Sequence, residues 1–114
     1  MNSATIRESK EAISSLDIQQ LEKHARQAAD MLKQLSNINR LMILCTLVNG
    51  ECSVGELHKT THLSQSALSQ HLASLRNAQL VQTRRQAQTI FYSLSGTESI
   101  QIISTLKSIY CREI

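Results

Sequence analysis

Proline and tryptophan are absent from this 114-residue sequence, and only three of its side chains are aromatic. Because so few rings cannot fill a core, the core is expected to be aliphatic. The three cysteines are an odd and sparse set, which excludes a structural disulfide framework. Gly-rich phosphate loops, carboxylate pairs in an apolar setting and nucleophile–base arrangements are also missing. These absences argue against an enzyme and against a bound cofactor.

Long apolar runs are missing as well. The longest, residues 41–48, is interrupted by Thr46 and is far shorter than the roughly 20 residues that span a bilayer. Residues 1–10 are polar and mixed in charge, unlike a signal peptide. We therefore expect a cytoplasmic protein with no membrane partner. A chain of this length makes one domain, which we predict over residues 16–114 after a flexible tail over residues 1–15.

Acidic residues are absent between Glu56 and Glu98, although the whole chain contains nine. The basic residues of the same stretch are Lys59, Arg76, Arg84 and Arg85. A carboxylate in this segment would repel phosphates, so an acid-free basic stretch favours a nucleic acid as the partner. A chance gap in the acidic residues is the alternative interpretation.

Apolar residues recur at helical spacing in the first half of the chain and predict a helix over about residues 16–35. Ser36 or Asn37 can cap a second helix that runs to Val48, where the pair Asn49-Gly50 ends it. This second helix is apolar on nearly every side, so we expect it to be the central, buried one.

A short helix over about residues 53–60, a turn over 61–63 and a further helix over about 65–77 predict a helix-turn-helix unit. Ser64 is a good N-cap for the last of these helices. Leu68, Leu72 and Leu75 form its apolar stripe.

Short hydrogen-bonding side chains dominate the rest of this helix. Glutamine can pair with adenine in two places at once, and serine can serve several bases. The residues predicted to contact DNA are Ser64, Gln65, Ser66, Ser69, Gln70 and His71, with Arg76 near the groove edge. A polar helix surface without a function is the alternative.

Two strands, over about residues 80–85 and 89–94, predict a β-hairpin with residues 86–88 at its tip. Arg84 and Arg85 end the first strand, within reach of a phosphate strand or the minor groove. Because side chains alternate between the two faces of a strand, we expect only one of them to contact DNA directly. An edge strand protected by its charges is the alternative.

Apolar residues at positions 100, 103, 106 and 109 predict a last helix that reaches Tyr110 or Cys111. The first and last helices lie outside the helix-turn-helix unit and are candidates for dimerisation. A two-fold dimer would place two reading helices about 34 Å apart, which is one turn of DNA. The fold class is therefore α+β, mainly α: a homodimeric winged helix-turn-helix of five helices with the hairpin, or wing, between the fourth and fifth.

This order of elements resembles the ArsR/SmtB family of bacterial repressors from about Leu21 onward. The matching stretches are SVGEL at residues 53–57, LSQSALSQHL at 63–72, LR at 75–76 and QTIFYSL at 88–94. The resemblance implies a repressor that binds double-stranded operator DNA as a homodimer.

The family's metal-binding patterns are not matched. Ser53 and Gly55 stand where the arsenic- and cadmium-type members have a Cys-x-Cys, and residues 96–114 contain neither His nor Asp. Of the four histidines only His58 and His62 share helical spacing, and they straddle the turn. We therefore predict no metal site, and a metal- or metalloid-responsive repressor is kept as an alternative.

Cys45 and Cys111 resemble the dithiol pair of the family's persulfide-sensing branch (BigR, SqrR and HlyU-like regulators). The resemblance implies that the reduced protein binds its operator and that persulfides, or another thiol oxidant, bridge the pair and release the DNA. Burial in an apolar helix would raise the thiol pKa of Cys45, whereas Cys111 should be the exposed, attacking thiol. Cys52 lies outside the pair and is interpreted as incidental. A winged-helix module that binds protein instead of DNA is the remaining alternative.

Overall fold

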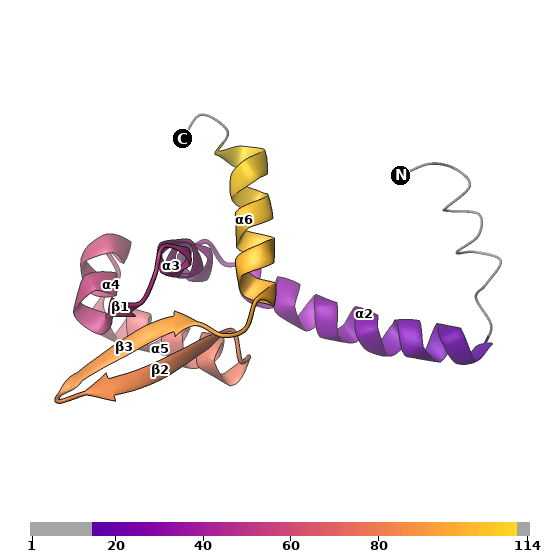
Figure 1. The fold of residues 1–114 in the computed structure, drawn as a ribbon, viewed down its shortest axis with the longest axis horizontal. Coiled ribbons are helices and arrows are strands. Elements are labelled where there is room, and N and C mark those ends of the chain that lie inside the picture. Colours follow the sequence, from indigo (N-terminus) through magenta and orange to yellow (C-terminus); the bar gives the residue numbers. More distant parts are fainter. Residues whose placement is uncertain (1–14, 112–114) are drawn as a thin grey trace. The chain divides into compact units, whose positions relative to one another are not determined.

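The computed structural model describes residues 15–111, which form five helices and a three-stranded antiparallel sheet (Figure 1). The elements are α2 (Ser15–Leu35), α3 (Ile38–Val48), β1 (Cys52–Ser53), α4 (Val54–Thr61), α5 (Gln65–Asn77), β2 (Val81–Gln86), β3 (Thr89–Leu94) and α6 (Glu98–Tyr110). The predicted winged helix-turn-helix fold is confirmed. The tail predicted over 1–15 lies outside the described residues except for Ser15, which begins α2.

The chain divides into two compact units, residues 1–32 and residues 33–114. In the first unit, α2 carries the predicted helical stripe, on which Leu21 and Leu32 are exposed. An exposed ion pair joins Arg26 to Glu22 one turn away, with 2.8 Å between nitrogen and oxygen. The site lies entirely within the second unit.

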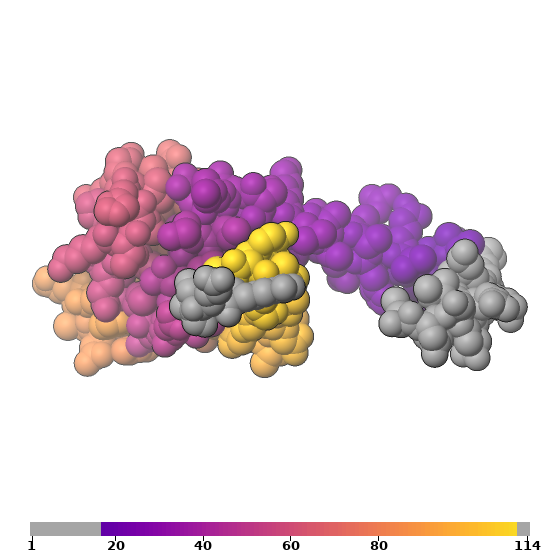
Figure 2. Space-filling view, turned by 90° about the horizontal axis from the view of Figure 1, so that it is seen from above, coloured from indigo at the N-terminus to yellow at the C-terminus, as the bar shows by residue number. Residues whose placement is uncertain are grey.

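Helix α3 is the central helix of the second unit, as predicted. The side chain of Asn37 caps it by accepting hydrogen bonds from the backbone N–H groups of Asn39 and Arg40, at 2.9 and 3.1 Å. The core that surrounds α3 is aliphatic, and its fully buried side chains are Ile43, Leu44, Leu57, Leu68, Leu75 and Ile103. Helix α6, which is yellow in Figure 2, packs against α3.

Local capping fixes the helix-turn-helix. Ser53 and Glu56 form a reciprocal capping box at the start of α4: the Ser53 N–H donates to the Glu56 carboxylate, and the Glu56 N–H donates to the Ser53 hydroxyl. His62 then takes a left-handed conformation with φ of 56°, which turns the chain. Ser64 caps α5 by accepting from the Ala67 N–H at 3.2 Å, as predicted.

The sheet has the order β1-β3-β2. The hairpin is tighter than expected: Gln86 pairs with Thr89, so only Ala87 and Gln88 form the tip, and Ala87 has a φ of 55°. Strand β1 was not predicted. It contributes two residues that pair with Tyr92 and Phe91, too few to show an alternating pattern in the sequence.

The capping box predicts a defined pH dependence. Hydrogen bonds from Ser53 hold the pKa of Glu56 below its ordinary value of 4.5. A lowered pKa in the folded state stabilises the protein above pH 4.5, and this contribution disappears as the pH falls through the folded-state value. Glu56→Gln keeps an acceptor but cannot titrate. Urea unfolding should therefore show that the stability difference between wild type and Glu56→Gln shrinks below pH 4.5.

Glu98→Gln is the matched control, since Glu98 also lies in the first turn of a helix but caps no backbone N–H among the described residues. If the two substitutions change the acid limb of the stability curve equally, the capping box is not its cause.

Candidate nucleic-acid interface and thiol pair

The outer face of α5 carries the polar residues that were predicted to read bases. Gln65, Ser66, Ser69 and Gln70 are all exposed, because the stripe on the opposite face is at most 2 % exposed. His71 is half-buried, so less of its ring is available to a partner. The structure therefore presents one row of short hydrogen-bonding side chains.

A cleft separates this face from the wing. It has a volume of about 570 Å³ and is lined by Val54, Ser69, Leu72, Ala73, Arg76, Asn77, Ile90 and Tyr92. Ser69 and Arg76, two of the predicted residues, form part of its α5 wall, while Ile90 and Tyr92 come from β3. A hollow of about 410 Å³ shares Val54 and Ile90 with it and continues to the hairpin tip. Helix α5 and the wing thus border two adjoining hollows.

The two wing arginines lie on opposite faces of the sheet. Arg85 pairs across the hairpin with Ile90, and paired residues share a face. Since Ile90 lines the cleft, Arg85 lies on the face of the sheet that borders the cleft. Arg84 pairs with Phe91 and therefore lies on the other face.

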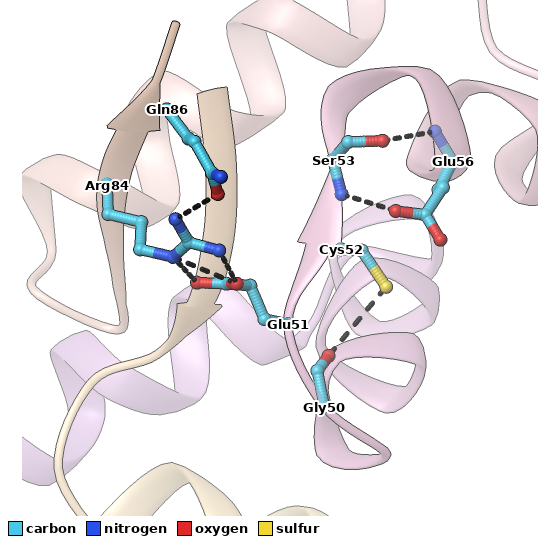
Figure 3. A network of polar contacts seen from close by, with 7 residues as sticks. All are labelled: Gly50, Glu51, Cys52, Ser53, Glu56, Arg84 and Gln86. Atoms are coloured by element: carbon cyan, nitrogen blue, oxygen red, sulfur yellow. Dashed lines mark hydrogen bonds and ion pairs between the residues drawn. The ribbon is translucent and has the colours of Figure 1, made fainter. Parts of the chain in front are cut away.

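Arg84 makes several contacts there. Its guanidinium donates hydrogen bonds of 2.7 to 3.0 Å to both carboxylate oxygens of Glu51 and one of 2.9 Å to the side chain of Gln86 (Figure 3). The guanidinium carbon also lies 4.5 Å from the centroid of the Phe91 ring. The hydrogen-bonded Glu51 carboxylate raises the pKa of Arg84 further above its ordinary value. Sequence reasoning missed Glu51, which lies outside the acid-free stretch and is brought to the wing by the unpredicted strand β1.

The three cysteines are free thiols in different surroundings. Cys45 is half-buried on α3, and Cys111 is exposed directly after α6. Burial raises the pKa of the Cys45 thiol, the charge of Lys107 lowers it, and Cys111 raises it further. Lys107 lies in the last turn of α6 and Cys111 directly follows it, so the packing of α6 against α3 brings the predicted thiol pair within electrostatic range.

Cys52 is separate from this pair. It lies half-buried on β1, where its thiol donates to the carbonyl oxygen of Gly50 across 3.7 Å. Burial and then the charge of Glu56 raise its pKa. Within residues 15–111, no three His, Cys, Asp or Glu side chains gather in a way that would hold a metal ion. No helix of the described part is long and apolar enough to span a bilayer.

Comparison with known proteins identifies relatives over most of the chain. Residues 37–83 match the family model described as "Bacterial regulatory protein, arsR family". The transcriptional activator HlyU of Vibrio cholerae is 50% identical over 97 residues, which cover 85% of this chain and 90% of that protein. The biofilm growth-associated repressor of Xylella fastidiosa is 44% identical over 93 residues and 82% of each chain.

Solved structures agree with this result. Reduced HlyU from Vibrio cholerae superimposes with a TM-score of 0.78 over 82% of this chain and 98% of its own, at 53% identity. The homodimeric winged helix-turn-helix DNA-binding domain Mb0332 from Mycobacterium bovis superimposes with a TM-score of 0.70 over 89% and 90%, at 25% identity.

The curated relatives are transcriptional regulators, which supports the prediction that the chain is not an enzyme. The predicted resemblance to the ArsR/SmtB family is confirmed by the family model and by relatives that match most of both chains. The chain is therefore a transcriptional regulator that belongs to the ArsR family of bacterial regulatory proteins.

Proposed function

We propose that the chain is a homodimeric repressor that binds operator DNA through α5 and the wing and releases it when Cys45 and Cys111 are bridged. The observation that carries the DNA-binding part is the continuous acid-free surface from the outer face of α5, across the cleft, to Arg85. Such a surface offers hydrogen bonds to base edges and attracts the phosphate backbone. Because its target is chromosomal, we assign the repressor to the cytoplasm.

In this proposal α5 enters the major groove and the cleft faces one phosphate strand. Gln65, Ser69 and Gln70 are free to meet base edges, whereas the hydroxyl of Ser64 already accepts from the Ala67 N–H. Ser64 and Ser66 at the start of α5 are better placed to contact a phosphate, and the half-buried His71 is placed at the margin of the DNA-contacting surface. Arg76 lines the cleft and supplies a cation beside the same strand.

Dimerisation is supported by the apolar surface of α6. Ile103 is fully buried against the core, but Ile100, Ile109 and Tyr110 are 42%, 47% and 80% exposed. Large apolar side chains left on one helix of a small domain favour a partner surface. The structural relative Mb0332 is described as homodimeric. A second copy would provide the two reading helices that a palindromic operator requires.

The thiol switch follows from the positions of the pair. The exposed Cys111 thiolate would attack the outer sulfur of a low-molecular-weight persulfide, forming a protein persulfide and releasing the reduced thiol. The Cys45 thiolate would then attack the inner sulfur, forming the disulfide and expelling hydrosulfide. Burial raises the pKa of Cys45, and the charge of Lys107 offsets part of this rise. The bridge would tie α6 to α3 and change the dimer spacing.

The sign of regulation rests on the family resemblance and on the repressor of Xylella fastidiosa, while the Vibrio relative is described as an activator. We therefore propose repression as the direct effect of binding.

Replacing Gln70 should weaken sequence-specific binding. Selection from a random duplex library first provides the operator, and fluorescence anisotropy then gives affinities for it and for a scrambled duplex. Gln70→Ala is expected to lose about 1–3 kcal/mol of discrimination, the usual contribution of a bidentate base contact. Gln101→Ala, an exposed glutamine of α6, should behave as wild type. Unchanged operator discrimination in Gln70→Ala would remove this residue from the reading surface.

Replacing either member of the thiol pair should separate sensing from DNA binding. Cys45→Ser and Cys111→Ser are expected to bind the operator as tightly as the reduced wild type but to remain bound after persulfide treatment. Cys52→Ser should still be released, and intact-mass spectrometry should detect the bridged form only when both Cys45 and Cys111 are present. Release of either pair variant by persulfide would place the sensor elsewhere.

A further inference from the structure

Neighbouring arginines of the wing have opposite surroundings. Arg84 donates to Glu51 from Nε and Nη2 along one edge of its guanidinium, and it also contacts Phe91. The side chain of Arg85, in contrast, is exposed and makes no hydrogen bond or ion pair with the described residues. Of these two side chains, only Arg85 is therefore free to meet a new partner without breaking an existing contact.

The register of the sheet explains the difference. Arg84 on β2 pairs with Phe91 on β3, and Phe91 pairs with Ser53 on β1, so the three residues form one row across the sheet. Glu51 lies just before β1, in the segment that joins α3 to α4. The Arg84 side chain thus reaches across β3 to this segment, on the sheet face away from the cleft.

The contacts of Arg84 are those of a fixed side chain. A carboxylate that accepts from Nε and Nη2 on one edge matches the planar fork of arginine, and the aromatic ring restricts the same group from a second direction. The pair is half-exposed, with side-chain exposures of 51% for Arg84 and 33% for Glu51, so its contribution to global stability is small. Its effect is local: it holds one strand of the hairpin to the segment before α4.

We propose that Arg84 is a positioning residue, which latches the wing to Glu51, and that Arg85 is the wing arginine that contacts DNA. This inference rests on the proposed function and assigns a separate role to each of the two wing arginines. A phosphate that approached Arg84 would have to displace a carboxylate already bound in two places. Arg85 lies on the same sheet face as Ile90, which lines the cleft, and carries an uncompensated charge.

Salt titrations of operator affinity distinguish the two roles. The slope of log affinity against log salt falls by about 0.9 for each lost phosphate contact, hence by about 1.8 for the two wings of a dimer. Arg85→Ala should flatten the slope by this amount. Arg84→Ala and Glu51→Ala should leave the slope unchanged but weaken binding about three- to tenfold for each wing, the range expected when a group that is mobile in the free protein must be immobilised on binding.

The double variant Glu51→Ala/Arg84→Ala tests whether the two residues act together. A latch predicts that it binds no more weakly than Arg84→Ala alone, because either substitution already opens the contact. These titrations are run above about 0.15 M salt, where a Debye length near 8 Å screens the charge that Glu51→Ala leaves uncompensated. Gln82→Ala, on the same strand and sheet face as Arg84, is the matched control and should behave as wild type.

Amide relaxation of the free protein tests the latch without DNA. Heteronuclear NOE values at the hairpin tip should fall in Arg84→Ala and Glu51→Ala but not in Arg85→Ala. The latch is overturned if these values are unchanged, whatever the protein binds.

The assignment of the DNA contact is overturned if Arg84→Ala flattens the salt slope as Arg85→Ala does, or if Glu51→Ala tightens operator binding. In either case the proposed function survives as long as Gln70→Ala still loses discrimination. A wild-type protein that binds no duplex would instead overturn the proposed function together with the role of Arg85.

Discussion

Burial of one face of α5 determines what its other face can do. Leu68, Leu72 and Leu75 are at most 2 % exposed, and each buried leucine contributes about 1.5–3 kcal/mol. That exceeds the net contribution of about 0.5–1.5 kcal/mol from a typical hydrogen bond, so the core and not the interface fixes the rotation of the helix. Since helical geometry leaves no other choice, Gln65, Ser69 and Gln70 face solvent. The surface proposed to bind DNA is therefore fixed by the core of the free protein.

The sheet also has one face toward the core and one away from it, and its side chains alternate between these faces with a period of two residues. The inner face begins in the core with Val81 and Leu94, both buried, and runs outward to the pair Arg85 and Ile90. The outer face carries the pair Arg84 and Phe91 and is closed by Glu51. The alternation of side chains along β2 therefore directs Arg84 to a partner within the chain and Arg85 to solvent. Because Glu51 compensates the charge of Arg84, the positive charge of the wing is smaller than its sequence indicates.

Features that depend on short stretches of sequence were predictable. The caps at Asn37 and Ser64, the buried α3 and the hairpin follow from local residue types and periodicity. Strand β1 and the contact between Arg84 and Glu51 were not predictable, because each depends on pairing between distant segments. The alternation of side chains along a strand predicted one direct arginine contact, but not which arginine makes it. The register shows that Arg85, and not Arg84, lies on the sheet face that borders the cleft. The dithiol role came from family resemblance and stays a prediction, although the structure brings Cys45 and Cys111 within electrostatic range.

NMR titration of the labelled protein with a selected operator duplex shows whether the outer face of α5 and the wing around Arg85 bind DNA. Backbone amide signals from Gln65 to Gln70 and around Arg85 should shift or broaden together, while those on the exposed side of α6, such as Ser104, should stay in place. Shifts confined to α6, or none on α5 at saturating duplex, would contradict the assignment of this surface to DNA.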